Sequence, residues 1–271
     1  MSAKMIEYRG LPAVLLENEV ARSIITLYGA HVVEYIPAGM DDLLFVSEKS
    51  EFVPGKAIRG GVPVCLPWFG APPERKSGNH GIARISGWEL LGADDCQACF
   101  ALKADEFALR YTVTAAESLD MCLEITNVSG NAAYYSGALH TYFKVGDIMQ
   151  VTVEGVDQTG YFNSLTGAGD IHSGVLKIDR ETDVVFRSCG GNTIVDPSCG
   201  RKIVISKNGS GSTVIWNPWI DKSRRMADFG DDEYLRMLCV ESANVPSIGD
   251  RRLLLPGQKS LLSQTVKAVK L

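Results

Sequence analysis

The chain has 271 residues, a net charge of -5 and a pI near 5.5. All-β sandwiches reach this length as one unit, so we expect a single domain over residues 1–271. The charge excludes the basic surface that a nucleic-acid backbone requires, and no apolar run approaches the roughly 18–20 residues of a membrane span. We expect neither nucleic acid nor a membrane as a partner.

Cysteine usage favours a reducing, cytoplasmic location. The seven cysteines are an odd number, and several lie in apolar surroundings, so we interpret them as buried thiols rather than as a disulfide framework. Cys96 and Cys99 have the spacing of half a zinc site, but no second pair completes it. The sequence therefore predicts no metal.

Short alternating apolar runs, which are typical of strands, recur along the whole chain. The first is Arg22–Tyr35, and the runs around Phe107–Val113 and Leu119–Ile125 predict a hairpin. Further runs follow at Gln150–Glu154, Asp183–Arg187, Lys202–Ser206, Ser212–Trp216, Leu238–Val240 and Ser260–Val269. The fold class predicted is all-β, an antiparallel sandwich or barrel.

Helical signal is weak. The best candidates are Lys222–Asp228 and a short turn at Asp232–Leu235, in a segment that mixes acidic and basic residues. Such a charge run is usually a solvated loop or face, and we interpret it in that way.

A long irregular segment, Pro54–Gly81, interrupts the strands, and loops of this length in compact domains are often functional. It lacks a phosphate-cradling glycine loop, so any phosphate must be held by side chains, with Arg59 and Arg84 as candidates. Trp68 and Phe69 could form an apolar wall for a sugar ring. Core packing is the alternative for both aromatic residues, and an ordinary surface position is the alternative for both arginines.

One imidazole and one carboxylate stand out as an acid and base. His140 and Glu241 each lie at the end of an apolar run that resembles a strand, so a fold that joined these ends could move two protons on one small substrate. Opening and closing a sugar ring needs that chemistry. By residue type alone, each side chain is more often structural or solvated.

Several segments, in the same order, resemble the hexose-6-phosphate mutarotases of the aldose 1-epimerase superfamily. The matching segments are Ile58-Arg59-Gly60-Gly61-Val62-Pro63, Pro67-Trp68-Phe69-Gly70, His80-Gly81-Ile82-Ala83-Arg84, His140-Thr141-Tyr142-Phe143 and Val240-Glu241. The resemblance implies a large antiparallel β-sandwich with an open groove. Two features depart from it: Leu66 replaces an aromatic residue common in relatives, and residues 72–79 carry the basic Arg75 and Lys76.

Roles follow from the resemblance residue by residue. It implies Glu241 as general base, His140 as general acid and His80 as a groove histidine near the ring oxygen. It also implies Arg59 and Arg84 at positions associated with phosphate, and Asp183 as a ligand of sugar hydroxyls. The reaction expected is anomer interconversion of a hexose 6-phosphate, with neither metal nor organic cofactor, by a monomer. The alternatives are an epimerase of unphosphorylated aldoses and a non-catalytic carbohydrate-binding module.

Overall fold

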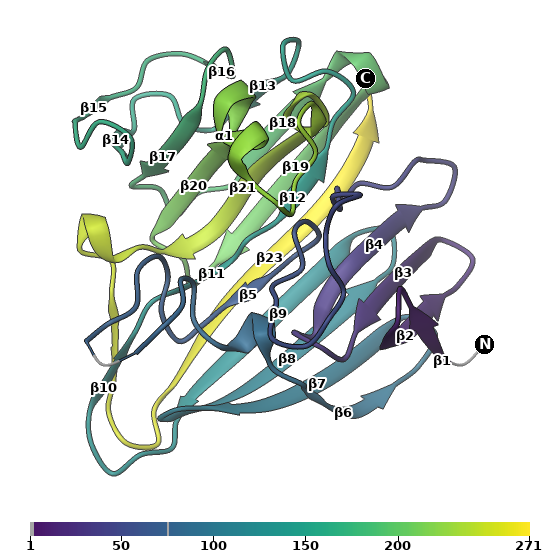
Figure 1. The fold of residues 1–271 in the computed structure, drawn as a ribbon, viewed down its shortest axis with the longest axis vertical. Helices are drawn as coiled ribbons and strands as arrows, with labels where there is room; N and C mark the ends of the chain where they lie inside the picture. Colours follow the sequence, from purple (N-terminus) through teal and green to yellow (C-terminus); the bar gives the residue numbers. More distant parts are fainter. Residues whose placement is uncertain (1–2, 75) are drawn as a thin grey trace.

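The computed structural model describes residues 3–74 and 76–271, and antiparallel strands dominate it (Figure 1). The N-terminal sheet has the order β1 (Lys4–Tyr8), β2 (Leu11–Glu17), β3 (Ala21–Thr26) and β4 (His31–Pro37). A two-stranded sheet pairs β10 (Ala133–Tyr135) with β22 (Arg252–Leu254). These two small sheets flank two large ones.

The first large sheet has nine strands. Its order is β16 (Leu176–Lys177), β13 (Thr152–Glu154), β18 (Asn192–Asp196), β19 (Arg201–Asn208), β23 (Lys259–Lys270), β9 (Leu119–Asn127), β8 (Phe107–Ala115), β7 (Gln97–Ala104) and β6 (Glu89–Ala93). Strands β8 and β9 alternate buried and less buried residues, which places one face of each strand in the core. This pair is the hairpin that the sequence predicts.

The second large sheet has eight strands and carries the site. Its order is β15 (Gly169–Ile171), β14 (Gly160–Asn163), β17 (Thr182–Phe186), β20 (Ser212–Asn217), β21 (Met237–Asn244), β11 (Gly137–Leu139) and β5 (Val64–Cys65), and β12 (Tyr142–Lys144) also pairs with β21. The β21 strand is buried along its whole length, which explains why its first half, Met237–Val240, is continuously apolar rather than alternating; its second half buries the polar residues Glu241, Ser242 and Asn244.

The helices are short. They are α1 (Trp219–Arg225) and four 3₁₀ turns, η1 (Ala83–Ile85), η2 (Pro197–Cys199), η3 (Glu233–Arg236) and η4 (Pro246–Ile248). Within the described ranges, none is long and apolar enough to cross a membrane.

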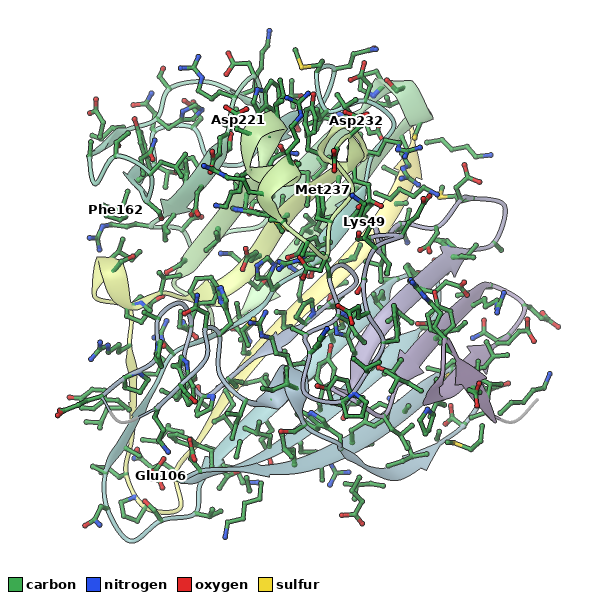
Figure 2. All side chains as sticks on the ribbon, viewed as in Figure 1. Lys49, Glu106, Phe162, Asp221, Asp232 and Met237 are labelled. Atoms are coloured by element: carbon green, nitrogen blue, oxygen red, sulfur yellow. The ribbon has the colours of Figure 1, made fainter. Side chains whose placement is uncertain are left out.

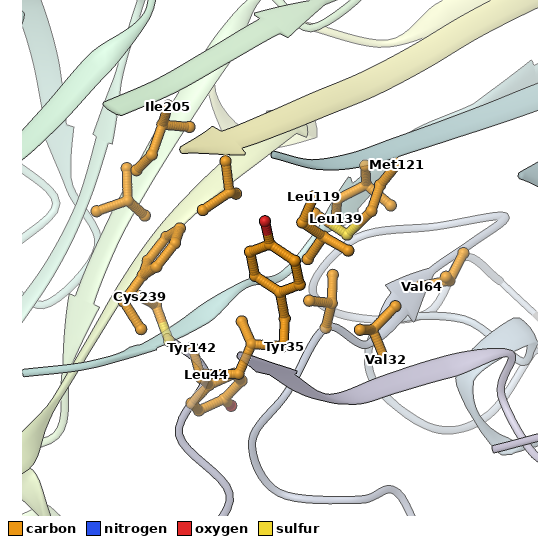
Figure 3. Packing of buried hydrophobic residues seen from close by; sticks show 14 of the residues in the cluster. Val32, Tyr35, Leu44, Val64, Leu119, Met121, Leu139, Tyr142, Ile205 and Cys239 are labelled. Atoms are coloured by element: carbon orange, nitrogen blue, oxygen red, sulfur yellow. The ribbon is translucent and has the colours of Figure 1, made fainter. Parts of the chain in front are cut away.

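One large apolar core joins three sheets. Figure 3 shows Tyr35 from the N-terminal sheet packed among Leu119 and Met121 of β9 and Leu139 of β11. The β23 strand runs through the middle of the molecule between β19 and β9 and also contacts β11 and β21 (Figure 1). The all-β antiparallel sandwich is confirmed.

Three local predictions are wrong. The run Arg22–Tyr35 is two strands, β3 and β4, because the chain reverses at Gly29 and Ala30, both of which have positive φ. The helix expected at Lys222–Asp228 begins earlier, at Trp219, and ends at Arg225.

The third concerns the cysteines. All seven are free, but Cys65 and Cys239 are the buried ones, whereas Cys189 and Cys199 are exposed. Cys189 follows the end of β17 in an irregular segment, and Cys199 closes the surface turn η2. The immediate neighbours of both cysteines are serine and glycine, so the apolar surroundings of other cysteines did not extend to these two.

Candidate active site

A single elongated cavity of about 1070 Å³ contains every residue that the sequence singles out for the site. Its lining reaches from α1 to the β7–β8 turn, whose positions are marked in Figure 2 by Asp221 and Glu106. The predicted residues that line it are Arg59, Trp68, His80, Arg84, His140, Asp183 and Glu241.

Strand register explains why His140, Asp183 and Glu241 lie in the same cavity. Asp183 lies opposite Trp216 on β20, which lies opposite Cys239 on β21, which in turn lies opposite Tyr142. In the neighbouring row, Val185, Val214 and Glu241 follow one another across the same strands. The pairs Leu139–Ser242 and Tyr142–Cys239 bracket the gap between β11 and β12, so His140 falls opposite Glu241. Residues that are distant in sequence thus become neighbours on one face.

The predicted acid and base are in direct contact. His140 Nε2 lies 3.3 Å from Glu241 Oε1, and both residues are buried. Their other polar atoms, His140 Nδ1 and Glu241 Oε2, have no hydrogen-bond partner among the described residues. Buried polar atoms are normally paired, so two open positions on one acid–base pair are a feature to expect where a polar ligand binds.

Burial favours the neutral form of both groups. It raises the pKa of Glu241 well above its usual value, with the Asp183 carboxylate adding to the shift. It lowers the pKa of His140, and the nearby His80, Arg84 and Arg59 act in the same direction. The roles of general acid and general base call for a charged histidine beside an ionised glutamate, whereas burial of the pair favours a neutral imidazole and a protonated carboxyl. Either arrangement places one proton on the pair.

The irregular segment supplies the opposite wall of the cavity. The β5 strand inside it pairs with β11, and the Pro63 carbonyl accepts a hydrogen bond from the His140 N–H, which fixes this wall beside the imidazole. His80 adopts positive φ and its ring lies edge-on to the rings of Phe69 and His140, with centroids 4.7 and 5.7 Å away. Burial lowers the pKa of His80 to about 3, so this ring is neutral near neutral pH.

Two aromatic residues of this wall have different roles. Trp68 is buried, with Nε1 donating to the Gly78 carbonyl at 3.0 Å, so packing and loop anchoring occupy most of its surface. Phe69 is the more exposed of the two and contacts His80 directly. Sequence reasoning weighed both as a sugar platform, and the contacts favour Phe69.

The Arg59 guanidinium already has two side-chain partners, Asp228 and Tyr142. Its Nε and Nη2 lie 3.1 and 3.0 Å from Asp228 Oδ2, and Nη1 donates to the Tyr142 hydroxyl at 3.0 Å. The Tyr142 ring stacks on His140, with centroids 4.8 Å apart and an interplanar angle of 10°. Arg59 is therefore connected to the imidazole through Tyr142.

The Arg84 guanidinium makes fewer hydrogen bonds than that of Arg59. Its Nη2 donates to the Asn79 carbonyl at 2.8 Å, while Nε has no partner among the described residues. Of the two predicted phosphate ligands, Arg84 has the more donors available. Arg75, which also drew notice as a basic residue, lies outside the described residues, whereas Lys76 lines the cavity and pairs with Asp105 at 2.9 Å.

Sequence reasoning missed three lining residues. Lys222 was assigned to a solvated charge run, yet its Nζ lies 3.3 Å from Glu181, 4.0 Å from Asp183 and 5.6 Å from the Trp216 ring centroid. Trp216 and Tyr142 line the cavity beside it. Tyr142 could have been found, because it lies two residues from His140 and side chains alternate along a strand. Trp216 required the strand register, and Lys222, which lies on α1, required the packing of that helix against the sheet.

His140, Cys239 and Glu241 place three donor atoms within 4.8 Å of one another. Burial raises the pKa of both Cys239 and Glu241, which keeps them protonated, and protonated groups bind metals poorly. The expectation of a metal-free site stays a prediction.

The fold and this cavity can be compared with known proteins. The family model described as aldose 1-epimerase matches residues 12–267. This chain belongs to the aldose 1-epimerase family. It is an isomerase that interconverts the α and β anomers of a sugar.

Individual relatives agree. A protein of Cenchrus ciliaris named "Putative glucose-6-phosphate 1-epimerase" is 35% identical over 250 residues, covering 82% of this chain and 74% of its own. An Escherichia coli K12 protein of the same name is 31% identical over 86% of this chain and 83% of its own. A crystal structure described as that of "a putative mutarotase" from Salmonella typhimurium superimposes with a TM-score of 0.91 at 26% identity, covering 100% of this chain and 94% of its own.

Proposed function

We propose that the substrate is a hexose 6-phosphate, with glucose 6-phosphate as the first candidate, and that His140 and Glu241 carry out the proton transfers. The observation that carries the proposal is the 3.3 Å contact between these two residues inside the cavity, where each has one further polar atom free for a ligand. The names of the relatives favour glucose 6-phosphate. Arg84, Lys222 and Arg251 give the cavity positive charge for a phosphate.

The reaction follows from two proton transfers. Glu241, ionised, takes the proton of the anomeric hydroxyl while His140, protonated, donates a proton to the ring oxygen, and the C1–O5 bond breaks. The product is an open-chain aldehyde. Rotation about C1–C2 presents the other carbonyl face, and the reverse transfers close the ring with the opposite configuration.

The protonation state that burial favours is compatible with these roles. A neutral His140 beside a protonated Glu241 holds the same single proton as the working ion pair. Moving that proton across the Nε2–Oε1 contact creates the acid and the base without any exchange with solvent. Sugar hydroxyls that bind the free atoms of the pair would stabilise its charged form, because burial is what disfavours it.

The surrounding residues bind and orient the sugar in this scheme. Asp183 accepts sugar hydroxyls, since it lies in the row adjacent to Glu241. Burial raises the pKa of Asp183, while a hydrogen bond with Ser164 and the charge of Lys222 oppose this shift and favour the carboxylate. His80 lies near the ring oxygen, and Trp68 with Phe69 closes the apolar wall. Arg84 binds the phosphate, and Arg59 supports His140 through Tyr142.

Substitution of the pair tests the chemistry. Glu241→Gln and His140→Asn should each lower kcat by at least about a hundredfold with little change in KM, because each removes a proton-transfer group and leaves most sugar contacts. Glu154→Gln and His172→Asn, which lie outside the cavity lining, are matched controls and should keep full activity. Anomer interconversion is followed polarimetrically. A Glu241→Gln or His140→Asn enzyme with more than about a tenth of wild-type activity would remove that residue from the mechanism.

The phosphate assignment is tested with two arginines and two substrates. Arg84→Ala should remove a charge-assisted contact worth about 1.5–3 kcal/mol, a loss of about ten- to hundredfold in kcat/KM for glucose 6-phosphate and much less for glucose. Arg59→Ala should reduce activity on both sugars, because it releases Tyr142 and Asp228.

The activity losses of these variants on the two sugars show which residue binds the phosphate, and the wild-type preference shows which sugar is the substrate. Equal losses for both sugars in Arg84→Ala would move the phosphate to another basic residue such as Arg251, Lys222 or Lys76. A wild-type enzyme that prefers glucose over its phosphate would replace the proposal with an epimerase of unphosphorylated aldoses.

Location and assembly are part of the same proposal. We infer that the enzyme acts as a cytoplasmic monomer on a diffusible small molecule. Seven free thiols suit a reducing compartment. His140 and Glu241 of the same chain are in contact with each other, so the two proposed proton transfers use groups of one protomer.

A further inference from the structure

A glutamine is buried behind the acid–base pair, on the opposite side of the sheet from the cavity. Gln264 lies on β23, and its neighbours on the same face, Leu262 and Val266, are fully buried apolar residues. The exposed fraction of Gln264 is 0%. An amide at such a position is costly unless its hydrogen bonds are satisfied, so its partners reveal what it holds.

The partners of Gln264 are the residues next to the catalytic pair. Thr141, which follows His140, donates its hydroxyl to Gln264 Oε1. The Gln264 Nε2 donates to the Val240 carbonyl at 3.2 Å and to Ser242 Oγ at 3.0 Å, and these two residues flank Glu241. All of these groups are buried. One amide from the nine-stranded sheet thus binds the backbone neighbours of both the acid and the base.

These hydrogen bonds of Gln264, called here the clamp, lie where the named pairing of β21 changes from β11 to β12. Regular pairing of β11 with β21 ends at Leu139, and that of β12 with β21 begins at Tyr142. Between them, the His140 N–H donates to Pro63 rather than to β21, and the bond from the Val240 N–H to the Thr141 carbonyl is long, at 3.3 Å. The Gln264 amide therefore connects Thr141, which lies between β11 and β12, with Val240 and Ser242 of β21, at a point where few backbone hydrogen bonds join these segments.

Alternation along the strands connects this clamp to the cavity. Side chains at Thr141 and Ser242 point inward to Gln264, so those of His140 and Glu241 point to the other face. A change in the spacing or tilt of the two strands at Gln264 alters the 3.3 Å separation of the imidazole and the carboxyl directly.

We propose that Gln264 is a positioning residue that fixes the distance and orientation of His140 and Glu241 from behind the sheet through Thr141, Val240 and Ser242. This inference rests on the proposed function of the pair. Positioning matters for the rate because proton transfer requires both groups to reach adjacent oxygens on one carbon, and small misplacements of catalytic groups are costly.

Gln264→Met tests the clamp, because methionine has a similar length and fills the space without hydrogen bonds. We expect kcat to fall about tenfold or more with KM within about twofold. Val266→Ala, two residues along the same buried face, is the matched control: it weakens the core but leaves the amide, and it should keep kcat near wild type at temperatures where it is folded.

A second variant separates positioning from stability. Gln264→Met leaves Thr141 and Ser242 unpaired in the core, which destabilises the protein. The triple variant Gln264→Met, Thr141→Val, Ser242→Ala removes these unpaired hydroxyls and should recover stability, since replacing both partners by apolar groups costs little. Its kcat should nevertheless stay low. The ¹⁵N resonances of the His140 imidazole should move in both clamp variants and stay in place in Val266→Ala.

The outcomes distinguish this inference from the proposed function when Glu241→Gln is measured alongside. If Glu241→Gln is inactive while the triple variant and Val266→Ala both keep wild-type kcat and His140 resonances, Gln264 is a structural core residue and the inference fails alone. If Glu241→Gln retains activity, the proposed acid–base pair is wrong, and the proposed positioning role of Gln264 is then wrong as well.

Discussion

Glu241 lies in an environment that disfavours the ionised form of its carboxyl. Its carboxyl is buried, its nearest charged neighbour of like sign is Asp183, and both effects raise its pKa well above the usual value. A protein retains such a residue at a cost in stability. The pH dependence of that cost gives a readout that is independent of activity.

Glu241→Gln is expected to stabilise the fold at neutral pH. Below about pH 4.5 the carboxyl is protonated in the folded and the unfolded chain, so wild type and variant should be equally stable. As pH rises, the unfolded chain releases this proton and the folded one keeps it. Wild-type stability then falls by about 1.4 kcal/mol per pH unit relative to the variant, until the raised pKa is reached.

Thermal melts of both proteins between pH 4 and 8 measure this difference. The Tm of the variant minus that of wild type should start near zero and grow with pH. Because His140 is in contact with Glu241, its titration is coupled to that of the carboxyl, so the same comparison is repeated in the His140→Asn background, which removes the coupling. A difference that is constant with pH, or that shrinks as pH rises, would show that Glu241 is ionised at its ordinary pKa in the folded protein.

Sequence reasoning could propose single residues where a motif suggested chemistry, but it could not foresee contacts that depend on how distant segments pack. His140 and Glu241 were predicted as a pair from two distant segments, and the structure places them in contact. Lys222 was predicted to be solvated, because nothing in a mixed charge run shows which cation turns inward. The hydrogen-bond partners of Arg59, which are Asp228 and Tyr142, could not be predicted either, because these contacts depend on how residues far apart in the chain pack together.

At the scale of elements, strands with clear alternation were predictable and the irregular segment was not. The β8–β9 hairpin follows from period-two burial on both strands. In contrast, the path of residues 54–74 and 76–81 depends on close backbone contacts that composition does not specify. Gly81 is the clearest case: at φ +70°, a Cβ there would lie 2.0 Å from the Leu66 carbonyl oxygen.

Gly81→Ala should therefore disrupt this wall of the site. The substitution combines left-handed strain, about 1–2 kcal/mol, with a backbone collision that costs about a further 1–3 kcal/mol. Gly78→Ala is the matched control, because Gly78 has a similar φ of +81° with nothing within 4 Å of its Cβ position. We expect a clearly larger drop in Tm for Gly81→Ala, and a larger loss of activity because His80 is the adjacent residue. Equal drops in the two variants would show that the loop relaxes away from Leu66.

For the whole molecule, the fold class was predictable because short alternating strands with turn residues between them leave few architectures. The assignment of strands to sheets was not. The β23 strand joins β19 to β9, which are more than 70 residues apart in sequence, and no local pattern specifies that pairing. The same strand carries Gln264 to the back of the site, so the long-range topology that was hardest to foresee is also what positions the chemistry.

This topology leads us to infer that residues 1–271 unfold as one cooperative unit. A single apolar core includes residues of the N-terminal, eight-stranded and nine-stranded sheets, and β23 contacts both large sheets, so no described boundary divides the core into halves. Two tryptophans report on different parts of it: Trp88 packs beside Tyr111 of β8, whereas Trp216 lies on β20 in the active site. Urea titrations of variants that keep one of these tryptophans and replace the other three with phenylalanine should give the same midpoint, coincident with the loss of far-ultraviolet circular dichroism. An earlier midpoint for Trp216 than for Trp88, with circular dichroism falling in two steps, would instead divide the chain into two folding units and place the active site in the weaker one.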